Sequence, residues 1–301
     1  MSIKKKMPTG LAKAKMSAKK KVAAVIAAAL VIFIISPIFP YAVSLGVMSV
    51  YSGIHEKDSI MAQKAIELEI PGGNATAEKD WYPFVMTFNP GSSFGRIAGD
   101  SSLELSILYN FGAFDLRRGC SILYDRTSEY YSSFYGAYLV TRKDDEATVS
   151  SACGTAPFGF DSEGHIDTEQ IAIVPEFDFQ HLVLGDFGIG TSEEVFQWDA
   201  ETAAEDVSYL GYDGWSRVDA NLLINGAAHI KRGFRRSYLQ YGVPAYDVTE
   251  NKDFLPVEME GRIYGRYFEE WDTSVFLYIL TPGKETLEKC DRDILSKSLL
   301  R

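Results

Sequence analysis

A run of 33 uncharged residues near the N-terminus constrains this chain more than any other feature. It extends from Val22 to Ile54, and its first part, Val22–Ile35, is entirely apolar. Eight lysines and no acidic residue precede it, within residues 1–21. A bilayer core takes about 20 apolar residues in a helix, and lysines next to a span stay in the cytoplasm. The sequence therefore predicts a basic cytoplasmic tail over 1–21, a transmembrane anchor over 22–50 and an extracytoplasmic remainder.

Two prolines qualify this prediction. Pro37 and Pro40 follow the purely apolar part, and each lacks a backbone donor, so we expect a kink or a helix end there. A cleaved signal peptide is the alternative to an uncleaved anchor. The long basic region, the long apolar run and the absence of a small-x-small cleavage site favour the anchor. The predicted location is the cell membrane, with a single pass.

The charge of the remainder limits its partners. Beyond the eight lysines of residues 1–21, 22 basic side chains stand against 41 acidic ones. Such a domain repels phosphate backbones, so nucleic acid is excluded as a partner. With 46% hydrophobic and 13% aromatic residues, the chain is able to bury a sizeable core.

The cysteines give no sign of a metal site. Cys120, Cys153 and Cys290 lie far apart in the sequence, without metal-type spacing. Outside the cytoplasm two of them could form a disulfide, and burial as apolar side chains is the other interpretation. We predict no metal and no cofactor.

The pattern of the remaining chain predicts an α+β fold. Residues 51–80 have the character of a stalk with a short amphipathic stretch, Ile60–Leu68. Alternation in Leu103–Tyr109 predicts a half-buried strand. The full set of expected strands is Trp81–Phe88, Leu103–Tyr109, Tyr135–Arg142, Gln170–Val174, Arg262–Tyr267 and Val275–Leu280.

Three helices are expected as well. The capping-box spacing of Thr191 and Glu194 predicts a helix to about Leu210. A second helix is expected over Trp215–Phe234, with Val218, Leu222 and Ile230 on one face. Thr281 and Pro282 then offer an N-cap and a first-turn proline for a final helix to about Leu299.

Three short segments carry a resemblance to a known family. They are Phe94-Gly95-Arg96-Ile97-Ala98, the string Tyr109-Asn110-Phe111-Gly112-Ala113-Phe114-Asp115, and Asn221-Leu222-Leu223-Ile224-Asn225-Gly226-Ala227-Ala228-His229. Together they resemble the permuted papain-like superfamily, above all the N-terminal periplasmic domain of bacterial lipoprotein N-acyltransferases. That domain has a Phe-Gly-His step, a strand ending in a similar Tyr-Asn string, and an Asn-Cys step at the start of a helix. The resemblance covers about Trp81–Phe234 and implies a papain-like domain over 81–240, with a C-terminal α/β extension over 241–301 packed on it.

The two catalytic positions implied by the resemblance are replaced. Arg96 stands where the family has histidine, and Ala227 where it has cysteine. Alanine is no nucleophile, and an always-protonated guanidinium is no general base. The resemblance therefore implies a pseudoenzyme with no catalytic residues, in which Arg96 and Ala227 lie within about 10 Å of each other.

Several residues are candidates for binding. Aromatic side chains of residues 124–138 offer a platform for sugar, peptide or acyl ligands, with packing over a sheet as the alternative. Lys231, Arg232, Arg235 and Arg236 form a basic patch suited to anionic headgroups or cell-wall polymers, or to a helix C-terminus. The predicted binding residues are Arg96, Asn110, Asn225, His229, Tyr131 and Tyr135.

These observations favour a membrane-anchored, extracytoplasmic, non-catalytic domain. Its expected ligand is a lipid, a lipidated protein or an envelope polymer. One alternative is an active thiol acyltransferase or hydrolase that uses Cys120 or Cys153. A second alternative is a sensor or an assembly subunit of a membrane complex.

Overall fold

The computed structural model describes residues 18–36, 38–72, 83–110, 112–115, 120–123, 127–143, 156–180, 195–225, 231–232, 235–236 and 256–301. The helices are α1 (Ala18–Ile35), α2 (Ile38–His55), α3 (Ile60–Lys64), α5 (Ser93–Ile97), α6 (Ile173–Asp178) and α8 (Lys284–Asp293), with 3-10 helices η1 (Glu56–Asp58), η2 (Gln170–Ala172) and η5 (Leu295–Lys297). The long strands are β2 (Pro83–Phe88), β3 (Leu103–Asn110), β6 (Phe134–Arg142), β7 (Phe196–Tyr209), β8 (Tyr212–Asn225), β11 (Pro256–Phe268) and β12 (Thr273–Thr281). Two-residue strands are β1 (Leu68–Glu69), β4 (Phe114–Asp115), β5 (Cys120–Ser121), β9 (Lys231–Arg232), β10 (Arg235–Arg236) and β13 (Leu299–Leu300).

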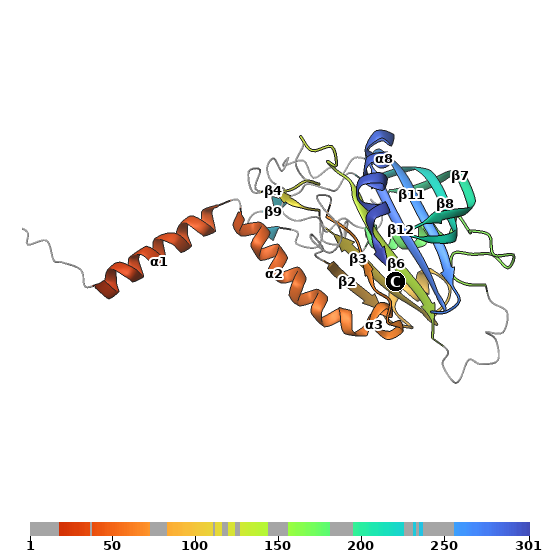
Figure 1. The fold of residues 1–301 in the computed structure, drawn as a ribbon, viewed down its shortest axis with the longest axis horizontal. Coiled ribbons are helices and arrows are strands. Elements are labelled where there is room, and N and C mark those ends of the chain that lie inside the picture. The colour runs from red at the N-terminus through yellow and green to blue at the C-terminus, as the bar shows by residue number, and fades with distance from the viewer. Residues whose placement is uncertain are drawn as a thin grey trace, which may run out of the picture.

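One seven-stranded antiparallel sheet organises the domain (Figure 1). Its strand order is β2-β3-β6-β12-β11-β8-β7, so strands from the C-terminal part of the chain occupy its centre. The fold is α+β, as the sequence predicts. The prediction of strands was right at β2, β3, β6, β11 and β12.

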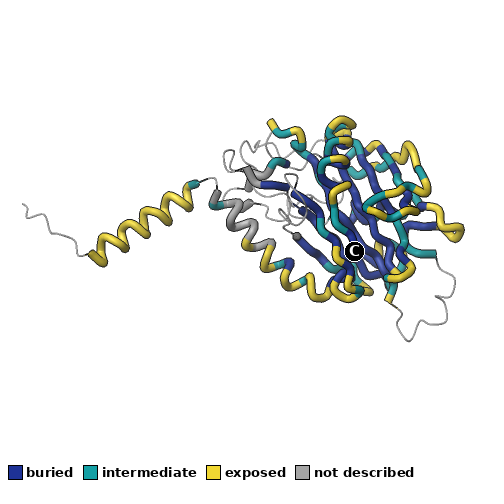
Figure 2. The backbone as a smooth tube through the Cα atoms, viewed as in Figure 1, coloured by how far each residue is buried: buried dark blue, intermediate teal, exposed yellow. Residues whose placement is uncertain are grey.

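Both faces of the sheet are covered, as the buried strands in Figure 2 show. The first face packs beneath α5, α6 and residues 156–172, with Phe94, Phe177 and Phe276 in its core. The second face packs beneath α3, α8 and η5, with Ile60, Leu277 and Leu295. Because of this double cover, the prediction that Leu103–Tyr109 is half-buried was wrong. Every residue of β3 is buried.

The N-terminal helices differ in how they meet the sheet. α1 buries no residue and extends away from the domain, whereas the end of α2 lies along the edge strand β2 (Figure 1). Ser52 of α2 accepts a hydrogen bond from the Val85 backbone N–H at 3.0 Å, and Tyr51 stacks on Phe84 at 5.0 Å. α2 therefore protects an edge that would otherwise expose unpaired backbone groups. Among the helices in the described part of the chain, none has both the length and the apolar character needed to cross a membrane.

Two of the predicted helices are strands. The expected helices beginning at Thr191 and Trp215 correspond, over the described residues, to the hairpin of β7 and β8. Val218 and Leu222 lie on one face in either structure, because four residues is close to one helical turn and is also twice the strand period. Gln170–Val174, expected as a strand, instead forms η2 and the start of α6.

The predicted division into stalk, domain and extension does not follow the packing. Within the expected stalk 51–80, Ile60, Ile66 and Ile70 are buried core residues, and β1 pairs with the C-terminal β13. The expected extension 241–301 supplies β11 and β12, which are central strands of the sheet. The final helix begins later than predicted, with Gly283 rather than Thr281 at its N-cap.

Candidate functional site

The structure describes the side chains of four predicted binding residues, Arg96, Asn110, Tyr131 and Tyr135, and only Tyr131 and Tyr135 are near each other in the chain. Arg96 lies on the short helix α5 with its side chain exposed. Asn110 is buried at the end of β3, where its side chain donates to the Ile70 carbonyl at 2.7 Å and accepts from the Gly112 N–H at 3.0 Å. Asn110 therefore joins the segment after β1 to the turn after β3, which is a structural role.

The last of the three segments that resemble the papain-like superfamily, residues 221–229, lies only partly within the described residues. Asn225 is the last residue of the strand β8, where the resemblance implies the beginning of a helix. Ala227, His229 and Cys153 lie outside the described residues, so the predicted proximity of Arg96 and Ala227 stays a prediction. Cys120 belongs to β5, which pairs with β4.

The aromatic residues do not form one platform. Tyr135 is buried in the core of the second face, whereas Tyr138 is buried in the core of the first. The Tyr138 hydroxyl donates to the Ile171 carbonyl at 2.8 Å, and Tyr131 is half-buried. Packing thus accounts for Tyr135 and Tyr138. The backbone of the basic patch forms the paired strands β9 and β10, without the helix that was expected there.

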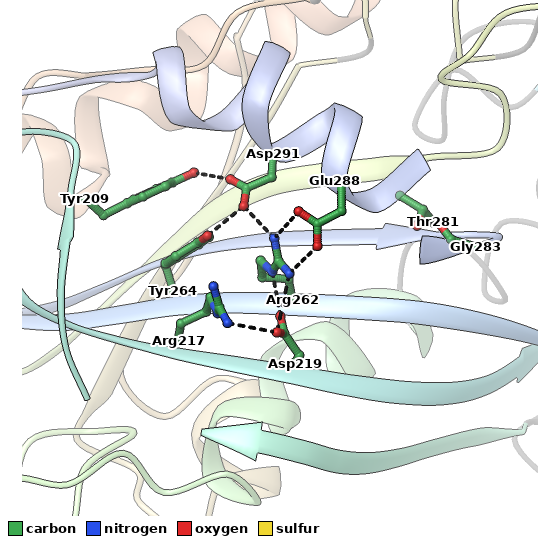
Figure 3. Close-up of polar contacts among 9 residues, drawn as sticks. All are labelled: Tyr209, Arg217, Asp219, Arg262, Tyr264, Thr281, Gly283, Glu288 and Asp291. Carbon is green, nitrogen blue, oxygen red and sulfur yellow. Dashed lines mark hydrogen bonds and ion pairs between the residues drawn. The ribbon is translucent and has the colours of Figure 1, made fainter. Parts of the chain in front are cut away.

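The densest polar cluster of the described residues surrounds Arg262 of β11 (Figure 3). Its side chain is 5% exposed, and its guanidinium group contacts three carboxylates. The partners are Asp219 of β8 at 2.5 Å, Glu288 of α8 at 2.8 Å and Asp291 of α8 at 2.7 Å. Strand register places Arg262 opposite Asp219, and α8 crosses above both. Residues 219, 262 and 291 are therefore brought together only by the tertiary fold.

Two tyrosines complete this cluster. Tyr264 and Tyr209 donate their hydroxyls to Asp291 at 2.6 and 2.8 Å, and their rings stack with centroids 3.8 Å apart (Figure 3). Burial raises the pKa of both tyrosines, and the charge of Asp291 adds to this. Burial alone would lower the pKa of Arg262, but its hydrogen bonds to the three carboxylates raise it above the ordinary value.

The Arg262 cluster is suited to holding α8 on the sheet rather than to proton transfer. Asp291 accepts from three donors, and both ends of the guanidinium group are occupied. Hydrogen bonds to Arg262 lower the pKa of Glu288, which favours a fixed carboxylate over an acid. No signal in the sequence pointed to this cluster, because its members lie on separate elements.

The thiol of Cys290 is unsuited to catalysis. Its side chain is fully buried on α8, and burial raises its pKa to about 12. A nucleophilic cysteine requires the thiolate form and access to a substrate, and Cys290 has neither. Among the residues that the structure describes, no group of His, Cys, Asp or Glu is arranged to hold a metal ion.

A shallow groove lies where β7, β8 and β11 run side by side. Its volume is about 510 Å³, and carboxylates of Asp199, Glu258 and Glu260 line it together with Asn221 and apolar side chains. Asn221 donates to Glu201 at 2.7 Å. The groove is acidic and open, and it adjoins the exposed edge strand β7.

No protein-family model matches this chain, and neither a curated protein nor a solved structure matches it significantly.

Proposed function

We propose that this protein is a membrane-attached, non-catalytic binding domain held at the bilayer by its N-terminal helices. The observation that carries the proposal is α1, a helix that is apolar on all sides after its first lysines and buries nothing in the domain. Its large apolar side chains from Val22 to Ile35 are between 41% and 76% exposed. In a globular protein a helix apolar on every side belongs in a core or in lipid, and neither core of the described residues includes α1.

The proposed orientation follows from charge. Lys19, Lys20 and Lys21 open α1, with five more lysines before them, and such basic flanks stay cytoplasmic. The sheet would then lie on the extracytoplasmic side. Two residues separate α1 from α2 in the sequence, and α2 contacts the edge strand β2, so the domain would stand close to the bilayer surface.

The non-catalytic part of the proposal rests on the side chains described above. The Arg262 cluster is saturated by its own partners, Cys290 is inert, and Arg96 is an exposed cation. A lipid, a lipidated protein or an envelope polymer remains the proposed class of ligand. The papain-like resemblance and a thiol enzyme using Cys120 or Cys153 remain predictions. Covalent labelling of either cysteine by an acyl-donor probe would favour the enzyme.

Membrane attachment is tested by charge substitutions in α1. The double variant Ile26→Lys/Val31→Lys should move the protein from the membrane pellet to the soluble fraction after alkaline washing. A lysine at the centre of a bilayer costs about 3 kcal/mol, so two remove most of the driving force. Ile97→Lys/Val257→Lys is the matched control, because these apolar side chains are also exposed but belong to the domain.

The orientation is tested with a reporter fused behind Arg301, which is exposed at the end of the chain. Extracytoplasmic reporter activity is expected. A soluble wild-type protein, or equal loss from the membrane in both double variants, would contradict attachment through α1. Cytoplasmic reporter activity with intact membrane attachment would contradict the orientation alone.

A further inference from the structure

A buried carboxyl group, Asp178, fastens α6 to the first face of the sheet. Asp178 is the last residue of α6 and is 7% exposed. Tyr109 of β3 donates its hydroxyl to one carboxyl oxygen, and Tyr278 of β12 donates to the other at 3.5 Å. One helix and two strands that are not neighbours in the sheet thus meet at a single carboxyl group.

The groups that face Asp178 are hydroxyls rather than cations. Tyr138 of β6 lies beside Tyr278, with ring centroids 6.2 Å apart, and its hydroxyl donates to the Ile171 carbonyl. On α6 itself, Glu176 accepts from Gln180 at 3.5 Å. Within the described part of the chain, no cation pairs with Asp178.

Two further elements that contact α6 add no compensating charge. η2 has no titratable side chain, and the only titratable residue of α5 is the exposed Arg96. Phe177 packs against Phe88 of β2 with ring centroids 4.8 Å apart, and β2 has no titratable residue either. A carboxylate in such surroundings is strongly disfavoured relative to the neutral acid.

The packing around Tyr278 depends on a glycine. Gly136 of β6 lies opposite Tyr278 in the register of the sheet. A Cβ atom at Gly136 would lie 2.9 Å from the Tyr278 hydroxyl oxygen and would also collide with the Leu108 carbonyl. The Tyr278 hydroxyl can therefore keep its position beside Asp178 only if residue 136 is glycine.

We propose that Asp178, Tyr109 and Tyr278 form a proton-responsive latch, which holds α6 on the sheet while Asp178 is protonated and releases it when Asp178 ionises. Burial raises the pKa of Asp178 to about 7 in the closed state, although the two tyrosine hydrogen bonds act in the opposite direction. In an open, hydrated state the pKa of this carboxyl returns to about 4. The closed state therefore binds the proton more tightly. Raising the pH from about 4 to about 7 increases the opening equilibrium by up to tenfold per unit, and the increase levels off above that range.

Hydrogen exchange of the full chain in detergent micelles tests the latch. Exchange of a peptide covering Ile173–Asp178, corrected for the intrinsic rate, should become at least about tenfold faster between pH 5 and pH 8. The exchange of peptides from β12 should not show this pH dependence. Asp178→Asn should remove the pH response, because the amide does not ionise. Asp161→Asn, at an exposed carboxyl of the same face, should keep the wild-type response.

A second variant keeps the test decisive if Asp178→Asn does not fold. Tyr109→Phe removes a donor that favours the carboxylate, so the midpoint of the exchange response should move to higher pH. Wild-type exchange of α6 that does not respond to pH would overturn the latch. So would a response that Asp178→Asn leaves intact, or a midpoint that Tyr109→Phe leaves unmoved or lowers.

Discussion

At the scale of single residues, Arg262 connects α8 to the second face through three carboxylates. Replacing it with alanine leaves Asp219, Asp291 and Glu288 without their shared cation, two of them largely shielded from water. Breaking a buried ion pair from one side typically costs about 3–5 kcal/mol. Arg262→Ala should lower the free energy of unfolding by about that amount, measured by urea denaturation.

The matched control for Arg262 is Arg217, which pairs with the same Asp219 at 3.4 Å but is 37% exposed. Exposed ion pairs contribute about 0–1 kcal/mol, so Arg217→Ala should be nearly neutral. Equal losses in the two variants would mean that the Arg262 cluster has no special role in holding α8.

The sequence located Arg262 within a strand but did not reveal its partners. Asp219 lay in a segment predicted as helix, and Glu288 and Asp291 lay in a helix whose docking face was unknown. Only the register of β8 against β11, and the crossing of α8 above them, makes one cluster of these side chains. The same holds for Asp178, which no local pattern connects to Tyr109 or Tyr278.

At the scale of elements, strands were predictable where apolar residues dominate the segment. β3, β6 and β12 are buried on both faces, so their β-branched and aromatic residues gave a clear signal. β7 differs, because most of its residues are exposed and its Ala-Glu composition favours a helix locally. Its strand form comes from pairing with β8, which is a tertiary effect that overrides local propensity.

The contact of α2 with β2 gives a prediction at this scale. Ser52→Ala removes the acceptor of the Val85 N–H, and both residues are buried. An unsatisfied buried donor costs about 1–3 kcal/mol, so the unfolding free energy should fall by that amount and the Val85 amide should exchange faster. Val50→Ala, at an exposed position of the same helix, should change stability by less than about 0.5 kcal/mol. Equal loss of stability in both variants would point to a general perturbation of α2 instead of the hydrogen bond, because alanine raises helix propensity and cannot itself cause the loss.

At the scale of the whole molecule, the sheet is assembled from distant parts of the chain. β2 and β3 precede the central β12 and β11 by more than 140 residues, and β1 pairs with β13 beside the C-terminus. A linear division into stalk, domain and extension therefore could not be correct, because the hydrophobic pattern gives each strand but not its neighbours. The pattern of charged and apolar residues over 1–54 can be interpreted without knowing which strands are neighbours. This part of the sequence was therefore the most direct to interpret.

This architecture separates attachment from folding, and two truncations should reveal the separation. A chain starting at Ser36 loses α1, which buries nothing, so its melting temperature should stay close to that of the full chain in detergent while membrane attachment is weakened. A chain starting at Glu56 also loses α2, and with it the Tyr51–Phe84 stacking and the acceptor of the Val85 N–H. A loss of about 2–3 kcal/mol from these contacts corresponds to a fall of roughly 5–10 °C in a domain of this size. The uncovered β2 edge should also promote association between molecules, which light scattering would detect. If the first truncation destabilised the domain as much as the second, α1 would be part of the fold, and its apolar surface would no longer argue for a membrane.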